Sequence, residues 1–525
     1  VFSDTTEKIL ELDAHSLMAI AGVPATAFEM ARTLQTTFEF YRRSQLQSMS
    51  LPAKIRALSR LLRDNLPATL QGFGIVSPIF VGVEVNKPDS RPVIFFYDPL
   101  GAQFEAANFA GSGSGSGSIK SVLHFLEKWG KPRPAEMSAD EAVRRVRSGD
   151  RVVIAGRTDP QVIPKALGRR AGELRNVVLR GEQHYEDFSW VPPESAASFR
   201  VAGQQRNELV PSIFAHEFKP YDEGLLEGRP LDVLIVTVSP PDERGYCGFG
   251  HYLVTKQGMA RRARVVLAEV NANTVRTYGT NYIHVSDVAA FVPHDAPVWT
   301  ASPPREPNSI VTAMAGYLAE LVRDGDTIEM GIGSVIDYIH TLGVFRDKRD
   351  LGFHTGGTRY GFAGDVQAGI FTGARKTLHP GKIVLSACYA TAQDLVYIHE
   401  NPLFEIYDNS YVNSMAVVAA HENFVAINSA VGIDLTGQIT AESARGGEGG
   451  GLVGFAIGAV MSRGGRSIIV LPATASRGAR SRIAPKLDPG QAITVPRTFA
   501  DIIVTEYGVA RLLGKSLKER ARELV

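Results

Sequence analysis

Short apolar runs alternate with amphipathic stretches over most of the chain, from about residue 138 to its end. The runs of strand length lie at 152–156, 232–240, 263–273, 326–333, 382–389, 424–435, 467–475 and 500–508. The segment between 308 and 324 shows helical spacing most clearly, with one face made of Ile310, Met314, Leu318 and Leu321. Apolar strands that alternate with helices form parallel sheets covered by helices, so the pattern predicts an α/β fold.

Capping residues and prolines indicate where these elements begin and end. Ser138, with Glu141 three residues later, has the form of a capping box and predicts a helix over 138–150. Asn308 or Ser309 is the expected cap of the next clear helix, and Gly325 its expected end. The proline-containing segment 302–308 is expected to join two lobes, 138–305 and 306–525.

Residues 1–137 follow another pattern, in which two helices precede strands. The first helical stripe consists of Phe28, Ala31, Leu34, Phe38 and Tyr41. The second consists of Ile55, Leu58, Leu61 and Leu62, and Pro67 is expected to disturb its end. Strand-like runs follow at 79–85 and 93–106, the latter broken by a turn at 98–101.

The run 111–118 contains only glycine and serine, so by itself it is typical of a flexible linker. A helical pattern at 119–126 follows it without a polar gap. Two prolines within 131–138 then mark the expected boundary between the first region and the rest.

Composition excludes several classes of protein. A chain of 525 residues, 44% hydrophobic and 21% charged, has the make-up of an ordinary globular protein with two or three domains. The net charge of +1 favours neither nucleic acid nor a membrane surface as a partner. The two cysteines, Cys247 and Cys388, lie far apart, which favours a reducing, cytoplasmic setting. Because the chain lacks an initiator Met and ends within a helical pattern, we expect a fragment of a longer reading frame or a fusion.

Glycine-rich loops are the main candidate binding sites. They lie at 330–333 and 444–459, each between a strand-like and a helix-like segment. Glycine lets backbone N–H groups approach an anion closely, and a helix N-terminus favours negative charge. Neither loop matches a dinucleotide or P-loop motif, and an ordinary α/β turn explains each loop equally well.

Histidine and carboxylate motifs point to no further chemistry. The His-Glu pairs at 216–217, 399–400 and 421–422 lack the second His of a zinc protease motif, so no metal is expected. We expect His284, His354 and His379 to be hydrogen-bonded structural residues. Glu269, at a strand's carboxyl end, is expected in a salt bridge or a capping role.

Taken together, the motifs of 138–525 resemble the acetyl-CoA hydrolase/transferase family of class I CoA-transferases, which includes the 4-hydroxybutyrate and acetate enzymes. The matching segments are 238–250, 268–287, 324–333, 376–382, 427–443, 464–475, 481–483 and 504–522. The resemblance implies a two-lobed parallel-sheet fold, a homo-oligomer, acyl-CoA and a small carboxylic acid as substrates, and a Glu nucleophile that takes up the acyl group and then coenzyme A. It also implies oxyanion or CoA contacts at Gly331, Ile332, Gly333, Gly450 and Gly451, with Asn428 near the thioester.

The sequence departs from this family at the nucleophile. The family's Glu follows a His-Thr pair, but here the segment reads HTGGTRYG (354–361), which places Gly356 at that position. The family's Gln and Asp in the later loop are replaced by Leu452 and Gly454. Glu329 is the nearest acidic residue that could substitute for the nucleophile. We therefore expect ordinary transfer through a glutamyl thioester to be impaired.

Residues 1–137 resemble a truncated proteasome β-type subunit, a partial α+β Ntn-hydrolase-like segment. The matching segments are 20–43, 63–85, 95–105 and the serine-containing run within 111–118. The resemblance places Ser112 or Ser114 at the family's serine position, beside its active site, and suggests ring contacts through 1–137. The catalytic Thr, Asp and Lys of that family would all precede Val1, so no threonine protease is expected.

Three functions remain open from the sequence. The first is a CoA-transferase or thioester hydrolase. The second is a CoA-binding protein without transfer activity. The third is a proteasome-related assembly subunit.

Overall fold

The computed structural model divides into two compact units, Val1–Pro132 and Arg133–Val525. It describes residues 9–71, 74–84, 92–106, 134, 136–156, 159–181, 188–195, 197–201, 213–223, 231–333, 335–442, 451–475 and 478–525. The predictions for Ser112, Ser114, Gly450 and the helix at 119–126 lie outside these residues. No helix in the described part of the chain is long and apolar enough to cross a membrane.

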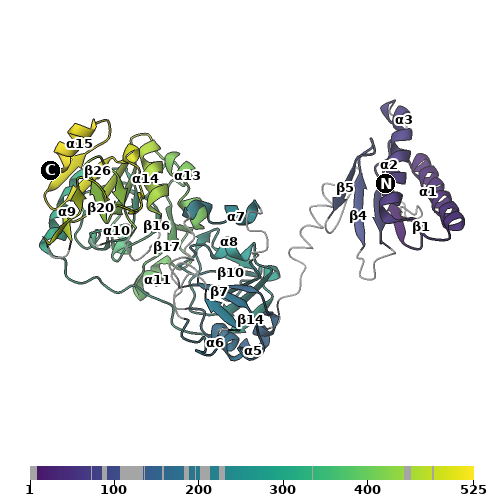
Figure 1. Cartoon of the computed structure of the whole chain (residues 1–525), viewed down its shortest axis with the longest axis horizontal. Helices are drawn as coiled ribbons and strands as arrows, with labels where there is room; N and C mark the ends of the chain where they lie inside the picture. The colour runs from purple at the N-terminus through teal and green to yellow at the C-terminus, as the bar shows by residue number, and fades with distance from the viewer. Residues whose placement is uncertain are drawn as a thin grey trace. The chain divides into compact units, whose positions relative to one another are not determined.

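The first unit is an antiparallel sheet with helices on one face (Figure 1). Its five strands are ordered as in the sequence: β1 (Ile9–Asp13), β2 (Ser16–Ala19), β3 (Ile79–Gly82), β4 (Val93–Tyr97) and β5 (Gln103–Ala106). Helices α1 (Pro24–Gln45), α2 (Leu51–Asp64) and α3 (Leu66–Leu70) follow β2. Leu34, Leu58, Met18 and Phe80 are fully buried where α1 and α2 cover the sheet. Pro67 lies in the first turn of α3, so the break predicted at the end of the second helix is confirmed.

The N-terminal lobe of the second unit is built on a six-stranded, all-parallel sheet. Its order is β14 (Ala290–Pro293), β11 (Val265–Val270), β9 (Val233–Val238), β6 (Arg151–Ala155), β7 (Val177–Gly181) and β8 (Phe199–Val201). Its helices are α5 (Ala139–Ala142), α6 (Val162–Arg169), α7 (Lys219–Asp222) and α8 (Lys256–Ala260). A small antiparallel pair is formed by β10 (Tyr246–Gly248) and β13 (Tyr282–His284).

The C-terminal lobe carries a nine-stranded sheet that is parallel except for its last pair. Its order is β12 (Tyr278–Gly279), β18 (Phe404–Ile406), β17 (Ile383–Ala387), β16 (Gly352–Gly357), β15 (Thr327–Met330), β19 (Phe424–Ser429), β22 (Arg466–Val470), β26 (Ile502–Thr505) and β27 (Gly508–Arg511). Small sheets are formed by β20 (Gly432–Asp434), β21 (Ile439–Thr440) and β25 (Ile483–Ala484), and by β23 (Thr474–Ala475) and β24 (Arg480–Ser481). The edge strand β12 precedes residue 305, so the chain of the N-terminal lobe contributes to this sheet.

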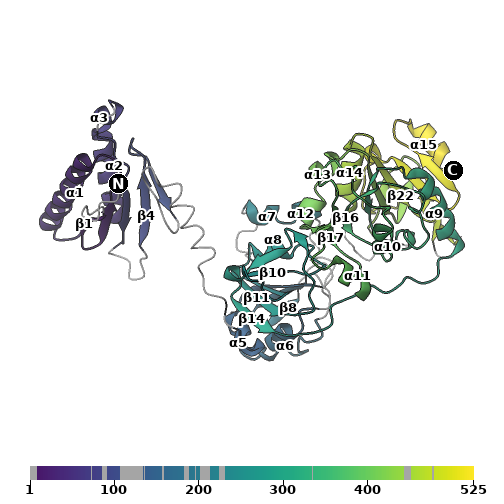
Figure 2. The same cartoon turned by 180° about the vertical axis from the view of Figure 1, so that it is seen from behind.

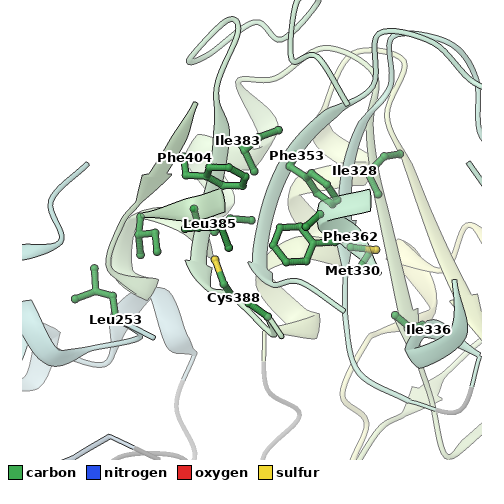
Figure 3. Close-up of a cluster of buried hydrophobic side chains, with 14 of the residues drawn as sticks. Leu253, Ile328, Met330, Ile336, Phe353, Phe362, Ile383, Leu385, Cys388 and Phe404 are labelled. Atoms are coloured by element: carbon green, nitrogen blue, oxygen red, sulfur yellow. The ribbon is translucent and has the colours of Figure 1, made fainter. Parts of the chain in front are cut away.

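Helices cover both faces of the nine-stranded sheet. They are α9 (Ser309–Leu321), α10 (Phe362–Gln367), α11 (Ala392–Ile398), α12 (Asn409–Val412), α13 (Met415–Ala419), α14 (Leu452–Met461) and α15 (Leu517–Leu524). The helix α14 packs on β19 and β22, with α13 beside it (Figure 2). On the other face Phe353, Leu385 and Met330 pack against Phe362 and Phe404 (Figure 3).

The predicted helix caps agree with the structure, but two predicted extents do not. Ser138 and Glu141 form a complete capping box, yet the helix is one turn, α5, followed by a 3-10 turn at Val143–Arg145. The Asn308 side chain accepts a hydrogen bond from the Val311 N–H at 3.0 Å and so caps α9. The prediction that Gly325 ends α9 is wrong. The helix ends at Leu321 because Val322, buried in the core, adopts an extended conformation.

Candidate active site

The predicted site residues of the C-terminal lobe converge at the carboxyl ends of three adjacent parallel strands. Gly331, Ile332 and Gly333 directly follow β15. Asn428 lies near the end of β19, which pairs with β15 through Met330 and Ile427. Gly356 lies near the end of β16, on the other side of β15. Ligands bind at this end of open parallel sheets, so the strand order supports one common site.

Strand register also places the candidate acid and the Gly356 position on one face of the sheet. Glu329 lies opposite Ala426 on β19, two residues before Asn428, and the Asn428 Nδ2 donates to Glu329 Oε2 at 2.7 Å. A Cβ atom added at Gly356 would lie 3.6 Å from the Asn413 Oδ1 and 3.7 Å from the Phe455 ring. These are ordinary van der Waals distances, and Gly356 is not in the left-handed region. The backbone therefore has room for a side chain at position 356.

Glu329 is placed poorly for a nucleophile. Its side chain is only 2% exposed, and burial raises its pKa to about 8, against the lowering effects of the Asn428 hydrogen bond and the Arg359 charge. At neutral pH the carboxyl group is therefore mainly protonated. A buried, protonated carboxyl group does not attack a thioester, so the geometry gives Glu329 a different role from the missing Glu.

The turn after β15 requires its glycines. A Cβ at Gly331 would overlap the Asn428 Oδ1, and one at Gly333, where φ is +139°, would overlap the Ser429 Oγ. The Ile332 side chain between them is 67% exposed. The N–H groups of Ile332 and Gly333 donate to no acceptor among the described residues. These two donors are suited to an oxyanion.

The later glycine loop ends beside the same site. A Cβ at Gly451, the residue before α14, would collide with the Asn413 amide. Leu452 is buried in an apolar cluster, and a Cβ at Gly454 would lie 2.5 Å from the Asn413 carbonyl oxygen. The helix α14 thus packs too closely against Asn413 to hold a side chain at position 454.

Two residues near the site were not predicted from the sequence. The Arg359 guanidinium is buried, donates from Nε to the Gly331 carbonyl at 2.9 Å, and lies 4.8 Å from the Tyr389 ring centroid. Burial lowers the pKa of Arg359, and Asp337 is its ion-pair partner at 3.4 Å. Asn413 lies between Gly356 and Gly451, and its buried Oδ1 has no hydrogen-bond partner in the described part of the chain. Arg359 stands only three residues after Gly356, which is the one sequence signal that could have identified it.

Residues expected to be structural have hydrogen-bond partners. The Glu269 carboxylate accepts from the N–H groups of Gln161 at 2.8 Å and Ile163 at 2.7 Å, so it caps α6. His284 bonds to Ser286, His354 to the Val412 carbonyl, and His379 to Glu405 and Tyr411. Among the described residues no group of three or more His, Cys, Asp or Glu side chains could hold a metal ion.

Comparison with known proteins identifies relatives of the second unit. The profile of the acetyl-CoA hydrolase/transferase C-terminal domain matches residues 392–525. The 4-hydroxybutyrate coenzyme A transferase of Clostridium kluyveri is 35% identical over 405 residues, which cover 74% of this chain and 93% of that protein. A probable butyrate:acetyl-CoA coenzyme A-transferase of Syntrophomonas wolfei is 34% identical, with coverage of 74% and 91%.

Solved structures give the same result. The 4-hydroxybutyrate CoA-transferase of Porphyromonas gingivalis has a TM-score of 0.64 at 32% identity, covering 74% of this chain and 92% of that one. RipA of Yersinia pestis has a TM-score of 0.66 at 30% identity, with the same coverage.

The N-terminal region has other relatives. The proteasome subunit profile matches residues 1–148. The proteasome subunit beta of Jonesia denitrificans is 39% identical over 122 residues, which cover 23% of this chain. The chain spans about two-fifths of that relative, 39% of its length.

The two predicted resemblances are therefore confirmed. Residues 1 to about 137 form a proteasome β-like segment, and through the rest of its length the chain belongs to the acetyl-CoA hydrolase/transferase family of CoA-transferases.

Proposed function

We propose that residues 138–525 bind an acyl-CoA and a small carboxylic acid at the strand ends of the C-terminal lobe, and that transfer through a glutamyl thioester is impaired. One observation carries the proposal: at the position where the family's nucleophile is expected, the strand presents Gly356, and the nearby Glu329 is buried against Asn428. Coenzyme A enters as part of the substrate.

The other residues retain the means to bind a thioester. The N–H groups of Ile332 and Gly333, which have no acceptor among the described residues, are suited to the thioester carbonyl oxygen, whose negative charge grows when a nucleophile attacks. Gly451, which has no side chain, approaches the Asn413 amide closely and brings its own backbone beside the site. Attack itself needs a carboxylate within reach of the carbonyl carbon, and position 356 offers none.

Restoring the carboxylate tests this proposal. The natural chain, Gly356→Glu and Gly356→Gln are incubated with acetyl-CoA and labelled acetate, and label in the CoA thioester is measured. We expect exchange by Gly356→Glu to exceed that of the natural chain on the order of 10²-fold. Gly356→Gln matches the size of the new side chain without its nucleophile and should resemble the natural chain. Equal exchange by the natural chain and Gly356→Glu would refute the missing-nucleophile argument.

A non-catalytic CoA-binding protein is the alternative that Gly356 favours. It predicts that acetyl-CoA raises the thermal midpoint of the natural chain although no exchange is detected. If Gly356→Glu also binds acetyl-CoA without exchange, this alternative replaces the transferase.

A proteasome-related assembly subunit is the alternative favoured by the match over 1–148. It predicts ring-shaped particles in electron micrographs. A dimer or tetramer by light scattering would support the homo-oligomer expected of a transferase instead. Cys247 and Cys388 are both buried and are not joined in a disulfide, which supports a reducing, cytoplasmic setting.

A further inference from the structure

A small cavity lies in the N-terminal lobe, at the carboxyl ends of its parallel strands. Its volume is about 20 Å³, and its lining includes Asp159, His251, Lys256, Thr274 and Trp299. Asp159 follows β6, Thr274 follows β11, and Trp299 follows β14. The cavity therefore occupies the kind of place where parallel sheets bind ligands, but it is separate from the turn after β15.

Three polar side chains in this cavity are buried and poorly satisfied. His251, Lys256 and Thr274 are 5%, 3% and 6% exposed. Within the part of the chain that the structure describes, the His251 Nε2 and the Thr274 Oγ1 have no hydrogen-bond partner. Among the described residues, the Lys256 Nζ donates only to the Phe249 carbonyl, at 3.3 Å, and forms no ion pair with a carboxylate. Buried polar groups are rarely left unpaired, so two such atoms beside a lysine with a single long hydrogen bond indicate a site for a polar ligand group.

The protonation of His251 defines what the ligand must offer. Burial and the nearby Lys256 charge lower its pKa to about 4, so the imidazole is neutral. A hydrogen bond with the Trp299 backbone favours the protonated ring, as a carbonyl that accepts from a ring N–H would. The Nε2 atom, which has no partner among the described residues, is then the acceptor of the neutral ring. The cavity thus presents an acceptor at His251, a donor at Lys256, and a hydroxyl at Thr274 that is able to do both.

The size and charge of the cavity favour a hydroxyl group over a carboxylate as its occupant. A cavity of about 20 Å³ holds one water-sized group, since about 10–15 Å³ is needed for one. A carboxylate is larger, has no proton for His251, and would face the Asp159 carboxylate. A hydroxyl group donates to His251 and accepts from Lys256. The geometry points to a subsite for the distal hydroxyl of a short hydroxyacyl group, formed by Thr274, His251 and Lys256.

Aromatic side chains link this subsite to the candidate active site. The Tyr389 ring lies 5.3 Å from Trp299 and 6.1 Å from Tyr252, which also lines the cavity. A Cβ at Gly357, the residue after Gly356 in β16, would lie 3.5 Å from the Tyr389 ring. An acyl chain lying along Tyr389 would run from the strand end of β16 to the cavity. The role in acyl selection rests on the proposed function, because it assumes that a thioester binds at that strand end.

The test compares ligands with and without the hydroxyl on the full chain. The shift in thermal midpoint is titrated with 4-hydroxybutyryl-CoA and butyryl-CoA, with 6-hydroxyhexanoyl-CoA and hexanoyl-CoA, and with free 4-hydroxybutyrate and butyrate. We expect at least one hydroxylated ligand to bind roughly tenfold more tightly than its plain counterpart, as one or two added hydrogen bonds would give. Thr274→Val should abolish that preference, so that the hydroxylated and the plain ligand bind equally.

Matched variants keep the result interpretable. Thr237→Val removes another buried, unpaired hydroxyl from the same lobe, outside the cavity, and should keep the preference. Lys256→Met should weaken the preference as well. If no thioester binds, the proposed function fails, while the free acids still test the cavity. Equal binding of hydroxylated and plain ligands, or a preference that survives Thr274→Val, would overturn the subsite and leave the cavity to solvent.

Discussion

Burial gives Glu329 a pH dependence opposite to that of most carboxylates. Its pKa rises from 4.5 to about 8 in the folded chain, so between these values the folded state holds a proton that the unfolded state has released. Stability then falls as pH rises, by at most about 1.4 kcal/mol per pH unit. The contribution is fully present below pH 4.5 and is lost as pH passes through 8.

Replacing this residue tests the assignment. Glu329→Gln keeps a side-chain oxygen for the Asn428 amide but removes the titration. We expect the variant to gain stability relative to the natural chain as pH rises from 5 to 8.5, measured by urea unfolding at each pH. A stability difference independent of pH would mean that Glu329 is ionised in the folded state.

His421 should lower the stability of the folded chain as the pH falls, whereas Glu329 lowers it as the pH rises. Both of its ring nitrogens are buried and have no partner among the residues that the structure describes, and its ring lies 4.8 Å from that of His354. Burial, with Lys376 and His379 adding to the effect, lowers the His421 pKa from 6.5 to about 3. The unfolded state therefore takes up a proton first, and stability is lost as pH falls from 6.5 toward 3.

The variant His421→Phe keeps an aromatic ring against Phe424 and removes this titration. We expect its thermal midpoint to fall less steeply than that of the natural chain between pH 6.5 and 4. Parallel curves for the two proteins would show that His421 is not the source of acid sensitivity.

At the scale of elements, local chemistry predicted the beginnings of helices better than their ends. The caps at Ser138 and Asn308 depend on side chains within three residues, and such contacts are visible in the sequence. The end of α9 depends on the burial of Val322 in a core formed by distant segments. The same reason explains why Asn413 was missed, since it approaches Gly356 and Gly451 only after three separate segments have packed.

Parallel topology was predictable because each strand is apolar and alternates with a helix. The sequence did not predict that the lobes share a strand, because β12 is only two residues long and pairs with β18 across the lobe boundary. The site's strands could be named from the sequence, but the shared face of Glu329 and Gly356 needed the register of β15 and β16.

The cap of α9 allows a quantitative test at this scale. Asn308→Ala removes the acceptor for the Val311 N–H, and we expect it to cost about 1 kcal/mol of unfolding free energy. Asn308→Gly should cost only a few tenths of a kcal/mol of unfolding free energy, because glycine is tolerated as a cap. Unfolding of the second unit can be followed by the fluorescence of Trp190 and Trp299. A larger loss in the glycine variant than in the alanine variant would contradict the capping role.

For the whole molecule, the division into two units agrees with the separation of its cores. The core of the first unit runs from Leu10 to Tyr97, and the cores of the second unit begin at Met137. The proteasome profile extends to residue 148, but Met137 donates its N–H to the Phe291 carbonyl and Ala142 packs in the N-terminal lobe. The packing therefore assigns 137–148 to the second unit, whatever their resemblance in sequence.

Separate cores predict separate unfolding. Leu34 is fully buried in the first core and Phe353 in the second. Truncation of either to Ala should cost about 2–5 kcal/mol, because the lost apolar contacts leave a cavity. In calorimetry of the full chain we expect two transitions. Leu34→Ala should lower the midpoint of one and Phe353→Ala that of the other, while acetyl-CoA should raise only the transition that Phe353→Ala moves. If either variant shifts both transitions together, the chain folds as one cooperative unit and the proteasome-like segment stabilises the transferase.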